Sequence, residues 1–173
     1  DERKIIIVNL SKGRVGESNA NLLGAMFITK IYLAAMSRAD IDPYAAEKLP
    51  PCYFYVDEFQ NFATDSFAVI LSEARKYGLN LTVANQYISQ MGEPVRDAVF
   101  GNVGTILCFR ISPDDAPFLE KYFTPQFEAS DLIQQHSRYF VTTMMIGDEK
   151  APAFSAKTLN LPKTPVDSTA QII

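Results

Sequence analysis

The chain has 173 residues, of which 47% are hydrophobic and 21% are charged, and its formal net charge is -4 at pH 7. This composition is ordinary for a globular protein, so it excludes a disordered chain and predicts one domain with a real core. The acidic balance excludes a surface evenly coated for nucleic acid, although it is compatible with a local basic pore. The single histidine, His136, excludes sites that need several histidines.

The two cysteines lie inside apolar runs, so we expect Cys52 and Cys108 to be buried free thiols. No metal-binding spacing surrounds them. We find no signal peptide and no apolar stretch long enough to span a bilayer, and we therefore expect a soluble, cytoplasmic domain. The chain starts without methionine and enters a predicted strand almost at once, which indicates part of a longer protein.

Strands and helices are predicted to alternate along most of the chain. The β-branched run Ile5–Val8 predicts a parallel strand covered on both faces, and Asn19 is the expected N-cap of a long helix to Arg38. Later strands are expected at residues 52–56, 79–84 and 105–109, and later helices at residues 65–77, 93–100 and 112–122. This order predicts an α/β fold with a mostly parallel sheet flanked by helices.

The pattern changes beyond Ser137. Residues 138–146 and 151–158 flank Gly147-Asp148, which predicts a C-terminal β-hairpin. The end of the chain, residues 161–173, is proline-rich and polar, so we expect a loose tail there. The predicted domain therefore comprises residues 1–160.

An acidic pair ends the strand at residues 52–56. Asp57 and Glu58 follow its apolar residues directly, and α/β proteins bind ligands at the carboxyl edge of a parallel sheet. An aspartate there can hold Mg²⁺, and an adjacent glutamate can polarise a water for attack on a phosphate. The pair thus indicates one end of a nucleotide site. The alternative is a buried strand that exits into an acidic loop.

Two other strand ends carry polar side chains. Asn85 and Gln86 follow the next strand, and an amide beside a nucleotide can orient a water because it both donates and accepts hydrogen bonds. Arg110 follows the fourth strand, and a guanidinium suits phosphate recognition in its own subunit or a neighbour's. Arg75, late in the helix at residues 65–77, is a second candidate. The alternatives are a turn for the amides and ordinary ion pairs for the arginines.

The segment Lys12–Ser18 contains two glycines between the first strand and the first helix. It lacks the Gly-Lys-Ser/Thr triplet of a phosphate-binding P-loop, and that triplet occurs nowhere in the chain. We interpret the segment as a strand-to-helix turn. A contact of its basic residues with DNA or with a neighbouring subunit is the alternative.

Four segments in this order resemble the HerA/FtsK superfamily of RecA-like motor ATPases, and most closely the TraG/TraD-like coupling ATPases of conjugation and type IV secretion. The segments are IIIVNLSKGRVGESNANLLG at 5–24, FYVDEFQNF at 54–62, EARKYGLNLTVANQ at 73–86 and NVGTILCFRISPDDA at 102–116. The resemblance implies the C-terminal half of a RecA-like P-loop NTPase core. It also implies that Asp57 is the Walker B aspartate for Mg²⁺ and Glu58 the catalytic glutamate.

The resemblance implies further roles and partners. Gln86 would be the sensor amide, with Asn85 as a weaker candidate, and Arg75 and Arg110 are both candidates for an arginine acting across a subunit interface. Family members use ATP and Mg²⁺ and form homo-hexameric rings that move DNA, or energise export, through a central pore. The implied partners are therefore other copies of the chain, DNA, and the secretion or conjugation machinery at the cytoplasmic face of the inner membrane.

The chain departs from the family because the Walker A strand and loop are missing. In the family's sheet that strand lies between the strands expected here at residues 79–84 and 105–109. We therefore expect a gap in the sheet or a non-native closure there, weak ATP binding and no useful hydrolysis by these residues alone. Two alternatives stay open: a non-catalytic RecA-like module that binds subunits or partners, and a magnesium phosphatase or nuclease that adds Asp114 and Asp115 to Asp57.

Overall fold

The computed structural model describes residues 4–42 and 49–161. The chain divides into two compact units, Asp1–Val103 and Gly104–Ile173, within the span that was predicted as a single domain. The predicted tail lies outside the described residues, apart from Leu161. The content is mixed α/β, as predicted, but the strands form three small sheets.

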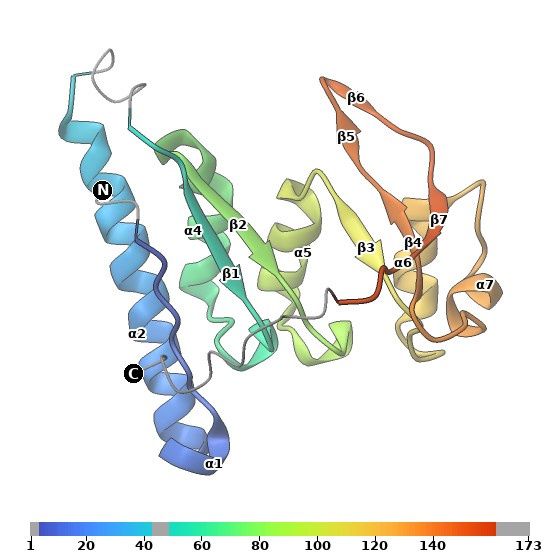
Figure 1. Cartoon of the computed structure of the whole chain (residues 1–173), viewed down its shortest axis with the longest axis horizontal. Helices are drawn as coiled ribbons and strands as arrows, with labels where there is room; N and C mark the ends of the chain where they lie inside the picture. The colour runs from blue at the N-terminus through green and yellow to red at the C-terminus, as the bar shows by residue number, and fades with distance from the viewer. Residues whose placement is uncertain (1–3, 43–48, 162–173) are drawn as a thin grey trace. The chain divides into compact units, whose positions relative to one another are not determined.

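The first unit contains a two-stranded parallel sheet (Figure 1). Strand β1 (Cys52–Val56) pairs with β2 (Leu79–Val83) in parallel, which confirms two of the predicted strands. Parallel neighbours need a crossover, and α4 (Asp65–Glu73) with the 3₁₀ turn η3 (Ala74–Tyr77) provides it. Gly78 ends the crossover at a φ of 69°, a conformation that favours glycine, as its position after the predicted helix suggested.

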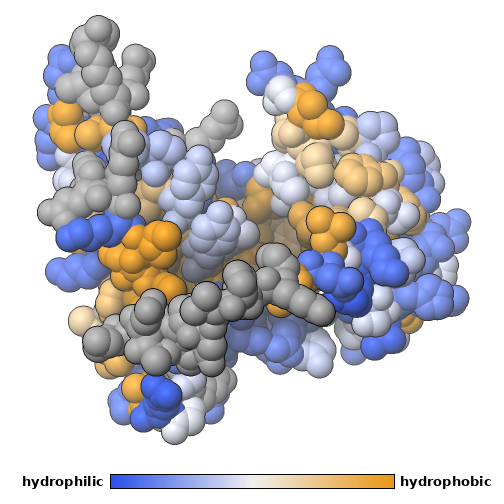
Figure 2. Space-filling model, in the orientation of Figure 1, coloured by the Kyte–Doolittle hydropathy of each residue, from blue (hydrophilic) through white to orange (hydrophobic). Residues whose placement is uncertain are grey.

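The segment Ile5–Val8 is not a strand, which corrects the prediction. A β-branched run forms a ladder only when a neighbouring strand edge pairs with it and other elements cover its faces. Here it has no pairing partner in the part of the chain that the structure describes. Ile5, Ile6 and Ile7 are 91%, 80% and 78% exposed. Figure 2 shows a hydrophobic area on the visible face of this unit, over the N-terminal segment.

Helix α2 (Glu17–Met36) confirms the predicted long helix but starts two residues before Asn19. Gly16 occupies the N-cap position, while the Asn19 side-chain amide donates to the Val15 carbonyl at 3.0 Å. A short helix, α1 (Lys12–Val15), lies within the segment that was interpreted as a turn.

One face of α2 is buried, and its members recur at nearly every fourth residue: Ala20, Gly24, Ile28, Tyr32 and Ala35. The Tyr32 hydroxyl donates to the Glu73 carboxylate at 3.0 Å and so joins α2 to α4. Burial, and then this carboxylate, raise the pKa of Tyr32.

By length and composition Glu17–Asp40 is apolar enough to cross a membrane, with 22% of its most apolar stretch buried, so the expectation of no such stretch was wrong. Core helices of soluble proteins pass the same test.

We expect Gly24→Ala to lower the free energy of unfolding by about 1–3 kcal/mol. Alanine is the better helix former by about 1 kcal/mol. A Cβ at Gly24 would, however, overlap the ring of Phe62, which packs against this turn of α2. Urea denaturation measures the change.

The matched control is Gly101→Ala in helix α5 (Glu93–Asn102), where an added Cβ meets no heavy atom within 4 Å. This variant should be neutral or slightly stabilising because only helix propensity changes. If both substitutions shift the free energy of unfolding equally, that result would contradict the close packing of Phe62 against α2 at Gly24.

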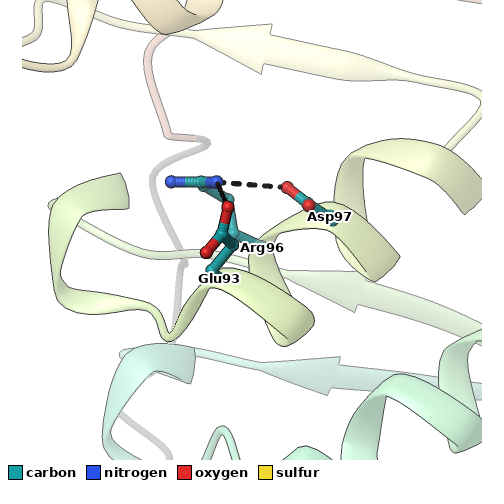
Figure 3. A network of polar contacts seen from close by, with 3 residues as sticks. All are labelled: Glu93, Arg96 and Asp97. Atoms are coloured by element: carbon teal, nitrogen blue, oxygen red, sulfur yellow. Dashed lines mark hydrogen bonds and ion pairs between the residues drawn. The ribbon is translucent and has the colours of Figure 1, made fainter.

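Helix α5 confirms the helix predicted at residues 93–100, and Pro94 lies in its first turn as expected. Figure 3 shows Arg96 between two acidic side chains on this helix, with its Nη2 atom 3.6 Å from Glu93 Oε1 and 3.3 Å from Asp97 Oδ1. Such exposed pairs contribute little to stability. The helix is held mainly by its apolar side, where Val95 and Val99 are buried.

The second unit is built on an antiparallel sheet of three strands in the order β3-β4-β7. Strand β3 (Ile106–Cys108) pairs with β4 (Tyr139–Thr143), which pairs with β7 (Phe154–Lys157). The hairpin prediction is confirmed, because β4 and β7 are antiparallel. The pair β5 (Met145–Ile146) and β6 (Glu149–Lys150) forms the end around Gly147-Asp148. A mostly parallel sheet is not confirmed, since among the described residues only β1 and β2 pair in parallel.

Two helices complete the second unit. Helix α6 (Ala116–Phe123) begins after Asp115 rather than at Ser112, whose hydroxyl instead accepts the Asp115 amide at 3.3 Å. Helix α7 (Ala129–Ile133) was not predicted, and a reciprocal capping box of Glu128 and Asp131 starts it. The apolar core combines these helices with the sheet through buried Leu119, Phe123, Leu132 and Val141.

Strands β2 and β3 belong to separate sheets among the described residues. A gap between these two strands was predicted from the missing Walker A strand, and it stays a prediction because β2 and β3 belong to different units. The structure assigns β1 as the one strand paired with β2 in the described chain.

Both cysteines are free thiols, as predicted; Cys108 is buried, which confirms its prediction, but Cys52 is exposed on β1, which corrects the expectation that it is buried. Burial, and then the charge of Asp115, raise the pKa of Cys108 to about 12. The folded chain therefore keeps a proton that the unfolded chain loses near a pKa of about 8.5. We expect this thiol to make the free energy of unfolding fall as pH rises from about 8.5 towards 12.

Chemical denaturation across this pH range tests the prediction. Cys108→Ala should show a shallower fall than the wild type, and Cys52→Ala should follow the wild type. Identical slopes for the wild type and Cys108→Ala would contradict it.

Candidate functional site

The acidic pair lies where β1 ends, and backbone hydrogen bonds fix that end to β2. The amide of Ala84 donates to the Val56 carbonyl at 2.9 Å, and the amide of Phe59 donates to the Ala84 carbonyl at 2.9 Å. These two hydrogen bonds involve the residues just before and just after Asp57 and Glu58, and they continue the pairing of β1 with β2 past the ends of the strands. The Phe59 side chain is fully buried, and its ring centroid lies 4.7 Å from that of Phe67 on α4.

Glu58 has a left-handed backbone conformation, with φ 51° and ψ 42°. This conformation is uncommon for a residue other than glycine and turns the chain sharply. The 3₁₀ turn η2 (Phe59–Asn61) follows, in which the Asn61 amide donates to the Glu58 carbonyl at 3.0 Å. The Glu58 amide donates to Asp57 Oδ1 at 2.9 Å. The two acidic residues are thus locally ordered.

Both carboxylate oxygens of Glu58 accept hydrogen bonds from side-chain amides. Gln86, which follows β2, donates to Oε1. Gln60, in η2, donates to Oε2 at 2.6 Å. The structure therefore joins the predicted residues Glu58 and Gln86 across two neighbouring strand ends. The sequence analysis did not single out Gln60, because its contact depends on the turn at Glu58.

A cavity of about 830 Å³ adjoins this edge of the sheet. Asp57, Glu58, Gln60 and Gln86 contribute to its lining, together with apolar side chains of α2 and β1. The described residues that line it include no lysine, arginine or histidine. The site therefore offers carboxylate and amide oxygens and amide donors, but no positive charge from the described residues.

The acidic pair is not neutralised by neighbouring cations. Within residues 4–42 and 49–161, neither Asp57 nor Glu58 forms an ion pair. No group of three or more potential metal ligands occurs in the described part of the chain. Asp114 and Asp115 belong to the second unit.

The other three predicted site residues are Asn85, Arg75 and Arg110. Asn85 is half-buried beside Gln86 and does not line the cavity. Arg75 belongs to η3, and its side chain lies outside what the structure describes. Arg110 follows β3 in the second unit, where it is exposed. The site of the first unit thus contains three of the six predicted residues, namely Asp57, Glu58 and Gln86, together with Gln60.

Comparison with known proteins identifies relatives of this chain. Residues 51–123 match the family model described as the TraM recognition site of TraD and TraG. Among solved structures, the chain is similar to the bacterial conjugative coupling protein TrwB, with a TM-score of 0.58 and 12% sequence identity. The match covers 79% of this chain and 37% of that protein, so this likeness concerns the fold. No curated protein matches the sequence.

Proposed function

From the relationship of this chain to the TraG/TraD-like coupling ATPases, we propose that it is the C-terminal half of a RecA-like ATPase motor. The motor would hydrolyse ATP to move DNA, or to energise substrate export, in conjugation or type IV secretion. In this proposal the chain works in a homo-hexameric ring at the cytoplasmic face of the membrane. It supplies the Walker B pair, the sensor amide and an interface arginine, for which Arg75 and Arg110 remain the candidates.

The observation that carries the proposal is the contact between Glu58 and Gln86. These residues follow different strands, 28 positions apart, and meet because β1 and β2 are parallel and end together. A carboxylate and an amide at one sheet edge, beside a cavity, suit a site that orients a water next to a phosphate. An acidic loop without function would not require an amide from the next strand.

The residues fit Mg²⁺ but do not by themselves fit a triphosphate. Asp57 is exposed, and only its Oδ1 atom accepts a hydrogen bond from the chain, so an oxygen ligand is available. Mg²⁺ usually takes one or two carboxylates and completes its shell with waters and phosphate oxygens, which explains why no larger ligand cluster is needed. A triphosphate also needs cations, and no lysine, arginine or histidine occurs among the described residues that line the cavity. The missing Walker A lysine would supply that charge.

When bound, Mg²⁺ would neutralise the charge of the phosphates. The side chains of this chain then bind the metal and position the attacking water. Asp57 provides the metal-binding oxygen, and Glu58 accepts a proton from the attacking water or orients it. Gln86 fixes the Glu58 carboxylate, and its side-chain oxygen can accept a further hydrogen bond from water.

Ion pairing of Asp57 and Glu58 would favour the non-catalytic alternative, and neither residue forms an ion pair among the described residues. A partner-binding role is compatible with catalysis. The family model is described as a TraM recognition site, and we propose that residues 51–123 also contact a TraM-like partner. Tyr53, which is 64% exposed on β1, is a side chain in that region available for such contact.

Magnesium-dependent ATP hydrolysis tests the proposed function. The 173 residues alone should show no turnover above background, because they contain no Gly-Lys-Ser/Thr triplet. The longer form that includes a Walker A strand and loop should hydrolyse ATP. Robust hydrolysis by the 173 residues alone would refute the proposal that these residues hold only half of the ATPase site. A folded, Walker A-containing protein that binds ATP but never hydrolyses it would favour the non-catalytic module.

A further inference from the structure

Resting on the proposed ATPase function, we propose that Gln60 is a positioning residue for the Glu58 carboxylate. Gln60 and Gln86 together form an amide clamp, defined here as the two side-chain amides that donate to the two oxygens of Glu58. Gln60 acts through Glu58 and has no chemical step of its own.

The backbone explains why Gln60 can reach this position. The left-handed conformation of Glu58 reverses the chain at the end of β1, and η2 then carries Gln60 back beside the Glu58 side chain. Phe59, between them, is fully buried and its amide is bound to Ala84, so the turn is anchored on the sheet. The Gln60 amide thus approaches from the local turn, while the Gln86 amide approaches from the neighbouring strand.

The chemistry of the contact indicates a specific orientation of the Gln60 amide. Its Nε2 atom lies 2.6 Å from Glu58 Oε2, a short contact, and a hydrogen bond to an ionised acceptor is stronger than one between neutral groups. Its Oε1 atom is buried without a hydrogen-bond partner. Flipping the amide would place Oε1 against the carboxylate and replace an attraction by a repulsion. The observed orientation is therefore the one that the Glu58 charge requires.

The clamp affects what Glu58 can do. A glutamate has three rotatable side-chain bonds, and a carboxylate that must meet a water in one place loses efficiency when it samples several rotamers. Two donors, one to each oxygen, hold the carboxylate and leave the other lone pairs of both oxygens available. Gln60 also lines the cavity next to Glu58, so the clamped carboxylate is presented at the cavity edge. Loss of either amide should therefore lower the turnover rate more strongly than it weakens the binding of nucleotide.

The test compares Gln60→Leu and Gln60→Glu in the full ATP-hydrolysing protein. Leucine removes the donor and keeps the approximate size, while glutamate is nearly isosteric and places a second negative charge beside Glu58. We expect kcat to fall by about tenfold to a hundredfold, the usual worth of a charge-assisted hydrogen bond, with nucleotide Kd unchanged. Gln126→Leu, at an exposed glutamine of the second unit, should keep the wild-type kcat. Thermal melts confirm that each variant is folded.

Unchanged kcat in both folded Gln60 variants would overturn the proposal, as would a fall explained by equal loss of nucleotide binding. A second readout does not depend on hydrolysis. In protein labelled with ¹⁵N-glutamine, Glu58→Ala should shift the side-chain amide signals of Gln60 and Gln86 and leave that of Gln126 in place. If the protein proves to hydrolyse no ATP, the proposed function fails, and these signals still decide the clamp: unmoved signals reject it.

Discussion

Glu58→Gln is expected to lower ATP turnover by about 10²–10⁴-fold, the usual contribution of a positioned general base, and to leave ATP binding intact. The substitution keeps the size of the side chain and removes its charge and its basicity. The residue would still lie at the end of β1 with its left-handed backbone, because Phe59 anchors the turn. Steady-state hydrolysis and nucleotide binding, both measured on the Walker A-containing protein, separate the two effects.

Glu149→Gln provides the matched control for this experiment. Glu149 is an exposed glutamate in β6 of the second unit, so the same chemical change there should leave turnover unchanged. A Glu58→Gln protein that keeps wild-type turnover would remove Glu58 from catalysis. Equal losses in both variants would point instead to a general effect of reduced negative charge.

The largest effect on stability is expected from Phe59→Ala, at about 3–5 kcal/mol of unfolding free energy. The ring is fully buried against Phe67, so its removal leaves a cavity under the end of β1. The amide of Phe59 also bonds to Ala84, and a loosened turn would weaken the bond that ties the acidic pair to β2. Urea denaturation gives the free-energy change.

Tyr53→Ala is the control, because Tyr53 is an aromatic residue of the same unit that is 64% exposed. Its loss should cost about 1 kcal/mol or less, the range of strand propensities. If Phe59→Ala costs no more than Tyr53→Ala, the turn after β1 is not anchored as described. If Phe59→Ala loses much of its unfolding free energy but keeps its ATP turnover, then Phe59 stabilises the fold without determining the geometry of Glu58.

The sequence predicted the meeting of Glu58 and Gln86 because two apolar runs each ended in a polar pair. Pro51 and Gly78 mark the starts of these runs, and parallel pairing then brings their carboxyl ends together. Gln60 could not be predicted in the same way. Its contact follows from a left-handed turn at Glu58, and no periodicity or residue preference in the sequence indicates such a turn at a glutamate.

The errors in the fold have a common physical cause, which is that pairing depends on the tertiary environment. The run at Ile5–Val8 has strand propensity but no paired edge in the described structure. The strand containing Cys108 was expected within a mostly parallel sheet, and its partner in the described structure is β4, which runs antiparallel to it. Helix α7 has only five residues, which is too short for a helical period to be visible.

The most direct test of the central claim is a structure of the Walker A-containing protein with ATP and Mg²⁺, determined in its Glu58→Gln form. The predicted result places Mg²⁺ beside the Asp57 carboxylate, either directly at about 2.1 Å or through one water, with the terminal phosphate next to residue 58. Nucleotide and metal bound away from the end of β1, with no contact to Asp57 or residue 58, would contradict the assignment of this acidic pair as half of an ATPase site.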